Sequence, residues 1–200
     1  MKTIIILFSS LAFILSANSA SAPDPVLDFA GKIIRAGDKY YVLPTVGKVD
    51  FGGLVLKVGN NSCSDGIARS SADDNGLSLS FTPVNNKKGV IRVSTDVNIK
   101  FPDFTGCKES NVWKLTYEKF MKQYAVVLGG VEGNPGQETL YNWFKIAKTS
   151  DGYKFVFCPS VCSSCKVKCS DIGLVTDEDG VPRLALNDDP YTFNFYGVTG

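Results

Sequence analysis

Four cysteines, at positions 158, 162, 165 and 169, lie in one short segment and are the residues best suited to chemistry in this chain. Their C-x3-C-x2-C-x3-C spacing could hold a zinc ion, because four thiolates can close a tetrahedral site. The same cysteines could instead form two disulfides if the chain matures in an oxidising compartment. The N-terminal sequence bears on this choice.

The first 22 residues have the pattern of a secretory signal peptide. Lys2 precedes an apolar run over 4–15, and small residues follow as far as Ala22. The apolar run is shorter than the ~20 residues that cross a bilayer. We therefore expect residues 1–22 to be removed and residues 23–200 to form a single secreted domain, in the apoplast or the vacuole. Export favours disulfides over a metal site.

The composition excludes several classes of function. The chain has 21 basic and 20 acidic residues and a formal net charge of +1, so we expect neither a nucleic acid nor a membrane as partner. It contains no histidine, which excludes Ser-His-Asp, Cys-His and H-E-x-x-H catalysis. The acidic clusters 73–76 and 177–180 each end in glycine and are typical of turns. We expect neither an enzyme nor a cofactor.

Short apolar or alternating runs recur along the chain, and all have the length of strands. Gly, Asn, Asp and Pro lie between them, and no helical periodicity is evident. Such a pattern predicts an all-β barrel or sandwich. A recurrence of about 55 to 60 residues would give three pseudo-repeats, the number in a β-trefoil. The runs are 40–43, 54–58, 77–81, 90–95, 97–101, 112–115, 125–128, 143–146, 153–157, 172–175, 183–186 and 191–195.

The sequence from Val26 to Pro44, VLDFAGKIIRAGDKYYVLP, resembles the plant Kunitz-type family of soybean trypsin inhibitor. The resemblance continues through IRVSTDVNIKF (91–101), GGVEGNPG (129–136), WFKI (143–146) and YKFVFCP (153–159). The run CPSVCSSCKVKC at 158–169 resembles the miraculin-like branch of that family.

This resemblance implies a β-trefoil of about twelve strands that inhibits serine proteases through one exposed, substrate-like loop. It also implies three disulfides and leaves no cysteine for a partner chain, so we expect a monomer. The implied pairs are Cys63 with Cys107, Cys158 with Cys169, and Cys162 with Cys165.

The segment that corresponds to the inhibitory loop lies between the runs 77–81 and 90–95. Its expected reactive residues are Pro83, Val84, Asn85, Asn86, Lys87 and Lys88. By analogy with soybean trypsin inhibitor, Asn85 would enter the specificity pocket of the protease. Trypsin prefers a basic residue there, and the loop offers these only at Lys87 and Lys88.

Inhibitory members of the family commonly brace this loop with an asparagine, and the matching residue here is Ala36, which has no side-chain donor or acceptor. The departure leaves a second hypothesis open. The chain could be a non-inhibitory trefoil that binds a carbohydrate or receptor or accumulates after stress, rather than a secreted defence protein that inhibits serine endopeptidases.

Two further features have competing interpretations. Asn60 begins the sequon Asn-Asn-Ser, which predicts N-glycosylation in an exported chain. Trp113 and Trp143 could line a sugar site, but aromatic residues on strands more often belong to the core. We predict that both tryptophans are core residues.

Overall fold

Twelve strands and one short 3-10 helix form in the residues that the computed structural model describes, namely 21–45, 52–57, 66–71, 73–104, 109–176 and 178–198. The elements are β1 (Tyr40–Pro44), β2 (Leu54–Lys57), β3 (Gly66–Arg69), β4 (Ser80–Pro83), β5 (Asp96–Lys100), β6 (Trp113–Glu118), β7 (Gln123–Leu128), η1 (Leu140–Asn142), β8 (Phe144–Lys148), β9 (Tyr153–Phe157), β10 (Ser170–Thr176), β11 (Pro182–Leu186) and β12 (Thr192–Gly197).

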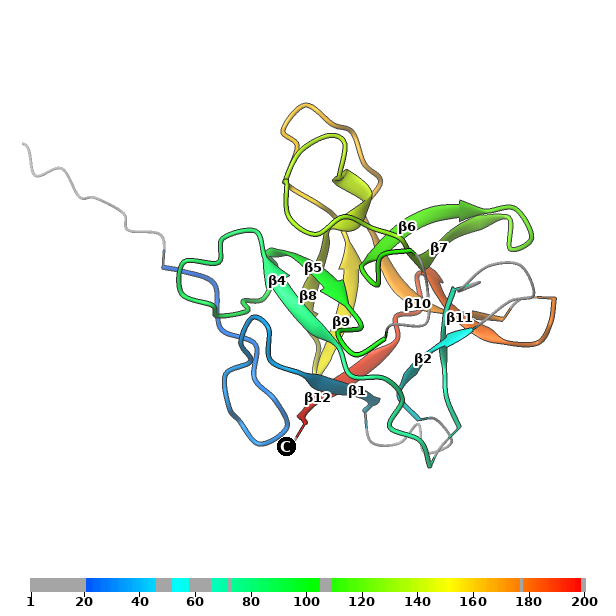
Figure 1. Ribbon diagram of the computed structural model, residues 1–200, viewed down its shortest axis with the longest axis horizontal. Coiled ribbons are helices and arrows are strands. Elements are labelled where there is room, and N and C mark those ends of the chain that lie inside the picture. Colours follow the sequence, from blue (N-terminus) through cyan, green and yellow to red (C-terminus); the bar gives the residue numbers. More distant parts are fainter. Residues whose placement is uncertain are drawn as a thin grey trace, which may run out of the picture.

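Six of these strands close into a barrel (Figure 1). The antiparallel pairs run in the order β1, β12, β9, β8, β5 and β4. A bridge between Tyr40 and Leu79 joins β1 to the residues that lead into β4 and completes the ring. Closure gives each barrel strand two neighbours, so no long unpaired edge is left to template aggregation.

The other six strands form three hairpins, β2–β3, β6–β7 and β10–β11. They meet through β11, where Arg183 pairs with Ala68 of β3 and Ala185 pairs with Ala125 of β7. Successive four-strand units begin at Tyr40, Asp96 and Tyr153. The predicted β-trefoil and its period of about 55 to 60 residues are therefore confirmed.

Aromatic side chains fill the barrel. Phe195 packs edge-on against Phe81 at 5.5 Å and against Phe193 at 5.1 Å between ring centroids, and Phe155 lies 4.4 Å from Phe193. All four rings are fully or almost fully buried. Each supplies a large apolar area, and edge-to-face pairs add a further preference for one arrangement.

Both tryptophans are buried, and Trp113 packs among these rings. Trp113 is 0% exposed and Trp143 is 1% exposed. Trp113 contacts Phe144 and Phe155 edge-on, at 6.2 and 5.4 Å between centroids. The prediction that both are core residues is confirmed.

One strand prediction was wrong, and one strand was not predicted. Residues 90–95 form no strand, because only isolated bridges, Pro25 to Arg92 and Arg35 to Val90, pair this stretch, and Ser94 has a positive φ of 57° that ends the extended run. Conversely, Gly66–Arg69 forms β3, although its short Gly-Ile-Ala-Arg sequence carries no clear alternation. Pairing with β2 over its whole length makes it a strand.

The described residues of the acidic clusters, 73–76 and 178–180, lie at turns, as predicted. Gly76 has a φ of 70° and Gly180 has a φ of 76°, a conformation that glycine adopts without steric cost. At Gly76 a Cβ would also lie 2.4 Å from the carbonyl oxygen of Leu54. A side chain at position 76 would therefore push Leu54 of β2 away from this turn.

Several predictions lie outside the described residues. They concern most of the signal peptide, the sequon at Asn60, and the pair Cys63 and Cys107. Among the residues that the structure describes, no helix has both the length and the apolar character needed to cross a membrane.

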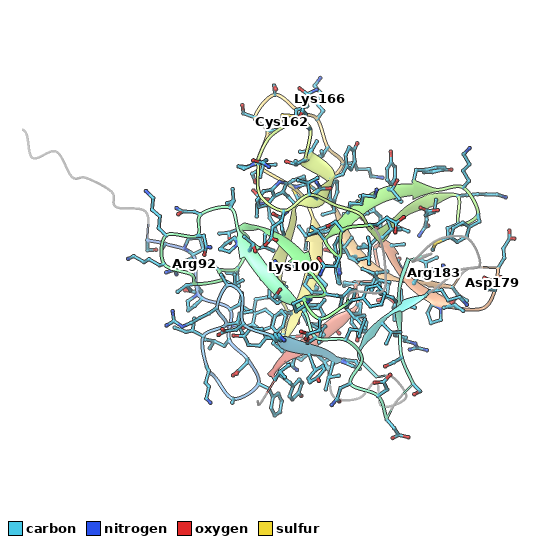
Figure 2. All side chains as sticks on the ribbon, viewed as in Figure 1. Arg92, Lys100, Cys162, Lys166, Asp179 and Arg183 are labelled. Atoms are coloured by element: carbon cyan, nitrogen blue, oxygen red, sulfur yellow. A yellow bond between two sulfur atoms is a disulfide. The ribbon has the colours of Figure 1, made fainter. Side chains whose placement is uncertain are left out.

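The cysteine-rich segment holds two nested disulfides, Cys158 to Cys169 and Cys162 to Cys165. This is the pairing that the family resemblance implies for these four residues. In the described part of the chain, no group of three or more His, Cys, Asp or Glu residues is arranged to hold a metal ion. Figure 2 shows this segment standing out from the barrel, with Cys162 and Lys166 near its tip.

A buried carboxylate ties this segment to the barrel. Asp96, at the start of β5, is 5% exposed and accepts hydrogen bonds from the Ser160 backbone N–H at 3.1 Å to each oxygen. The Lys145 ammonium lies 2.9 Å from Asp96 Oδ1 and donates to Ser160 Oγ at 2.7 Å. A buried charge is tolerated when it is paired and hydrogen-bonded in this way.

We predict that Asp96→Ala lowers the free energy of unfolding by about 3 kcal/mol, because it leaves the nearly buried Lys145 ammonium without its counter-charge. Guanidinium denaturation of the oxidised protein would measure the change. The matched control is Asp103→Ala, which breaks the exposed pair with Lys39 and should cost far less. Equal losses in the two variants would contradict the assignment.

Candidate functional site

The loop between β4 and β5 is an exposed projection with a buried base. Pro83, the last residue of β4, is buried, and the five residues that follow, 84–88, are exposed. Val84 is 42% exposed, although it is apolar. In Figure 1 this loop extends away from the barrel beside the N-terminal segment. The expected reactive residues 83–88 thus share one accessible loop.

Backbone hydrogen bonds hold both ends of the loop. The Val84 N–H donates to the Asp96 carbonyl at 2.9 Å, one step beyond the β4–β5 ladder. At the other end, the Ala36 N–H donates to the Gly89 carbonyl at 2.8 Å. The ends are therefore fixed while the residues between them face solvent.

A turn occupies the second half of the loop. The Gly89 N–H donates to the Asn86 carbonyl at 3.2 Å, which places Lys87 and Lys88 at the two central positions of a β-turn. The Asn85 side chain accepts a hydrogen bond from the Lys87 N–H at 3.4 Å, as in an Asx-turn. Asn85 and Asn86 precede the turn, whereas the two lysines form it.

Ala36 lies beside this loop, at the place where the sequence predicted a missing brace. Its backbone bonds Gly89, and its methyl group packs partly buried against the core. The side chain has no polar atom to offer. Support of the loop from this side is therefore limited to the backbone.

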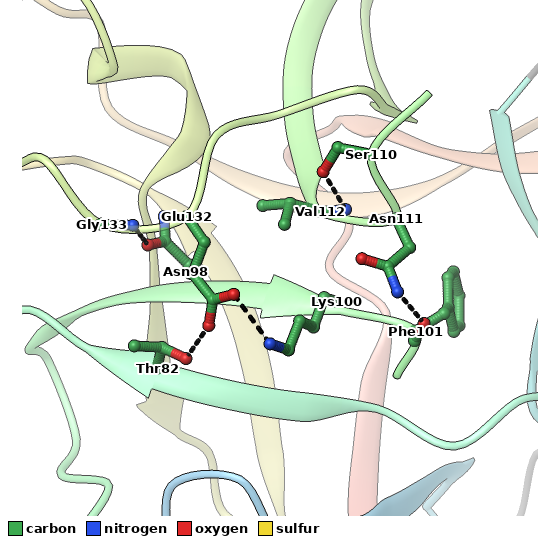
Figure 3. Close-up of polar contacts among 9 residues, drawn as sticks. All are labelled: Thr82, Asn98, Lys100, Phe101, Ser110, Asn111, Val112, Glu132 and Gly133. Atoms are coloured by element: carbon green, nitrogen blue, oxygen red, sulfur yellow. Dashed lines mark hydrogen bonds and ion pairs between the residues drawn. The ribbon is translucent and has the colours of Figure 1, made fainter. Parts of the chain in front are cut away.

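A second support comes from the segment between β7 and η1 (Figure 3). The Glu132 carboxylate accepts a hydrogen bond from the Thr82 hydroxyl on β4 and another from the Lys100 ammonium on β5 at 2.7 Å. Burial alone would raise the pKa of Glu132, but the bonds from Lys100 and Thr82 lower it below its ordinary value. The carboxylate is thus kept ionised at neutral pH.

Asn98 fixes the same segment from below. Its side chain is 2% exposed, accepts from the Gly133 N–H at 2.7 Å and donates to the Asn142 carbonyl at 2.8 Å. Our sequence interpretation did not single out Asn98, Glu132 or Thr82. One signal was available, because Asn98 keeps the polar–apolar alternation of β5 but is a residue type that strands disfavour.

A row of aromatic rings lies on another face of the protein. Tyr117 and Tyr124 face each other across β6 and β7, with centroids 5.5 Å apart. Tyr141 of η1 lies parallel to Tyr124 at 6.3 Å and to the buried Phe157 at 5.7 Å. Tyr117, Tyr124 and Tyr141 are 52%, 39% and 45% exposed. We call these three residues the tyrosine row.

Comparison with known proteins identifies the family. The model of the legume Kunitz family, described as trypsin and protease inhibitor, matches residues 26–196. Miraculin from Synsepalum dulcificum is 43% identical, over 94% of this chain and 90% of its own. Kunitz trypsin inhibitor 5 from Arabidopsis thaliana is 38% identical, over 98% of both chains.

A solved structure agrees with these relatives. The Kunitz-type cysteine protease inhibitor PCPI-3 from potato is 30% identical and superposes with a TM-score of 0.78, over 90% of this chain and all of that one. The family match over residues 26–196 includes the loop after β4 and the segment that carries Glu132. The chain therefore belongs to the plant Kunitz family of trypsin and protease inhibitors, in its miraculin-like branch.

Proposed function

We propose that this protein inhibits serine endopeptidases by inserting the loop of residues 83–88 into the protease cleft. The observation that carries the proposal is the exposed loop held by backbone hydrogen bonds at both ends. The printed name of the Arabidopsis relative, a trypsin inhibitor, supports the same class of partner. Plant defence is the role that fits such an activity.

Inhibition of this kind needs preorganisation rather than catalysis. Because the ends of the loop are already fixed, little conformational entropy remains to be lost on binding. Interfaces between proteases and protein inhibitors bury about 1,600 Å² in total. A 178-residue mature chain with one projecting loop would supply such an interface as a monomer, and neither a cofactor nor a nucleic acid is required.

Asn85 is the residue that we assign to the specificity pocket. It is exposed and precedes the turn, whereas Lys87 and Lys88 lie within the turn and would have to unfold it to adopt the extended form that a cleft binds. A neutral amide cannot pair with the aspartate of a trypsin-type pocket. The preferred target is then a protease whose pocket accepts a small polar side chain.

We predict that Asn85→Lys strengthens inhibition of trypsin by about tenfold or more, because a hydrogen-bonded ion pair replaces a neutral contact. Titration of trypsin activity would measure the inhibition constant, and mass spectrometry would identify the bond cleaved after long incubation. The control is Lys88→Asn in the same loop, which should leave trypsin inhibition nearly unchanged. Cleavage after Lys87 or Lys88 in the wild type would contradict our assignment of Asn85.

The proposal as a whole has a broader test. The mature protein is titrated against trypsin-, chymotrypsin-, elastase- and subtilisin-like enzymes, with a papain-like cysteine protease as a further arm because of the potato relative. Slowing of at least one serine protease is expected. Undiminished activity of all four serine proteases would reject the proposal.

The remaining assignments complete the proposed mature protein. Residues 1–22 act as the signal for export, residues 23–200 form the single mature domain, and Asn60 carries a glycan. The third disulfide joins Cys63 to Cys107. Peptide mapping under non-reducing conditions, with and without removal of N-linked glycans, tests these assignments together.

The tyrosine row favours a second candidate function, carbohydrate binding. Three partly exposed rings in a line form an apolar patch with polar hydroxyl tips, and exposed aromatic patches often mark ligand surfaces. Sugars present one apolar face and a rim of hydroxyl groups, which such rings can contact. The absence of a side-chain brace at Ala36 is consistent with a trefoil that no longer inhibits proteases.

We predict that, if the tyrosine row binds glycans, Tyr124→Ala reduces saturable binding on a glycan array at least about tenfold, since stacking and apolar contact are lost. The control is Tyr41→Ala, a tyrosine on β1 outside the row. Saturable binding by the wild type without any protease inhibition would support this second function. Equal losses of glycan binding in both variants would exclude the tyrosine row as the binding site.

A further inference from the structure

The two ends of the reactive loop are supported unequally. At the end near Gly89, the support comes from the backbone, through the hydrogen bond from Ala36 to Gly89 and the adjoining bridge between Arg35 and Val90. At the other end, the backbone bond of Val84 to Asp96 is supplemented by a side-chain contact, in which the Thr82 hydroxyl donates to Glu132. Thr82 lies immediately before Pro83. Glu132 therefore acts where the chain leaves the barrel for the loop.

The carboxylate of Glu132 is held in a fixed orientation. One oxygen accepts a hydrogen bond from the Thr82 hydroxyl of β4, and the other accepts one from the Lys100 ammonium of β5 (Figure 3). The carboxylate therefore bridges the two strands from which the loop emerges. Hydrogen bonds to an ionised acceptor are about twice as strong as bonds between neutral groups. A carboxylate bound at both oxygens can restrain Thr82 more than a mobile surface glutamate could.

The backbone beneath Glu132 is also fixed. The buried Asn98 accepts from the Gly133 N–H and donates to the Asn142 carbonyl, which ties the segment after β7 to both β5 and η1. The contacts form one continuous chain from η1 through Asn98 and Glu132 to Thr82. Because Asn98 is 2% exposed, water does not compete readily for these bonds.

We propose that Glu132 is a positioning residue for the reactive loop and takes over the bracing that Ala36 cannot provide. It acts from outside the loop, through the Thr82 hydroxyl, and itself makes no contact with the scissile bond. Its effect on inhibition rests on the function proposed above for residues 83–88. Its effect on the order of the loop does not depend on any protease.

The first test measures the loop in the free protein. Amide hydrogen exchange at Val84 and Ala36, whose N–H groups bond the Asp96 and Gly89 carbonyls, reports opening of the two ends of the loop. Glu132→Ala should accelerate exchange at Val84 by about tenfold, and Glu132→Gln, which keeps an acceptor for Thr82, should restore part of the protection. Thr82→Val should reproduce the alanine result and add little to it in the double variant.

The matched control is Glu138→Ala, which removes an exposed carboxylate from the same segment. Exchange in β9 serves as a second control, because a general loss of stability would accelerate it as well. Unchanged exchange at Val84 in Glu132→Ala, or an equal change in Glu138→Ala or in β9, would overturn the proposal.

The second test uses a protease that the wild-type protein inhibits. Glu132→Ala should weaken inhibition about tenfold and speed cleavage of the loop, with partial rescue by Glu132→Gln. Unaltered inhibition and cleavage in Glu132→Ala would overturn the bracing role in inhibition. If the wild type inhibits no protease, the proposed function fails, while the exchange measurement still decides whether Glu132 positions the loop.

Discussion

Closure of the six-stranded barrel is the constraint on which the rest of the structure depends. The ring of pairs from β1 through β12, β9, β8 and β5 to β4 turns six short strands into one unit around a single aromatic core. None of these strands exceeds six residues, and isolated pairs of that length are marginal in water. Stability therefore comes from closure and from the buried rings together.

A closed barrel of short strands leaves long connections free to serve as sites. The loop after β4 can be exposed along residues 84–88 because Pro83 and Phe81 keep its base in the core. The cysteine-rich segment shows the same division, with two disulfides in the projection and Asp96 as its anchor at the barrel. In both cases a rigid base carries an accessible surface, which is the arrangement that recognition loops commonly use.

Buried polar side chains fix these projections to the barrel. Asp96 and Asn98 lie two positions apart on β5, and both are buried. Asp96 binds the backbone of Ser160, and Asn98 binds the backbone of Gly133. A buried polar group is unfavourable unless it is hydrogen-bonded. These two side chains therefore favour the one position of each segment in which its backbone N–H reaches them. β5 is thus the strand from which the disulfide segment and the Glu132 segment are both positioned.

Much of this protein could be predicted from its sequence. Apolar runs at strand length, punctuated by Gly, Asn and Asp, predicted most of the strands and the turns at Gly76 and Gly180, because period and turn chemistry are local properties. The recurrence of these runs and the family resemblance led to the trefoil. Gly66–Arg69 escaped prediction because pairing with β2, rather than its own alternation, makes it a strand. Residues 90–95 were assigned wrongly because only isolated bridges to the distant residues Pro25 and Arg35 pair them.

The candidate site divides in the same way. The sequence by itself determined which residues occupy the loop, that a basic residue is absent at Asn85, and that Ala36 has no side-chain brace, since these are matters of residue identity. Only the tertiary structure decided that the Gly89 end of the loop is bonded to Ala36 and that Glu132, fifty residues from Thr82, bonds the Thr82 hydroxyl. Hydrogen bonds between distant segments depend on how the barrel folds them together, and no local pattern encodes that.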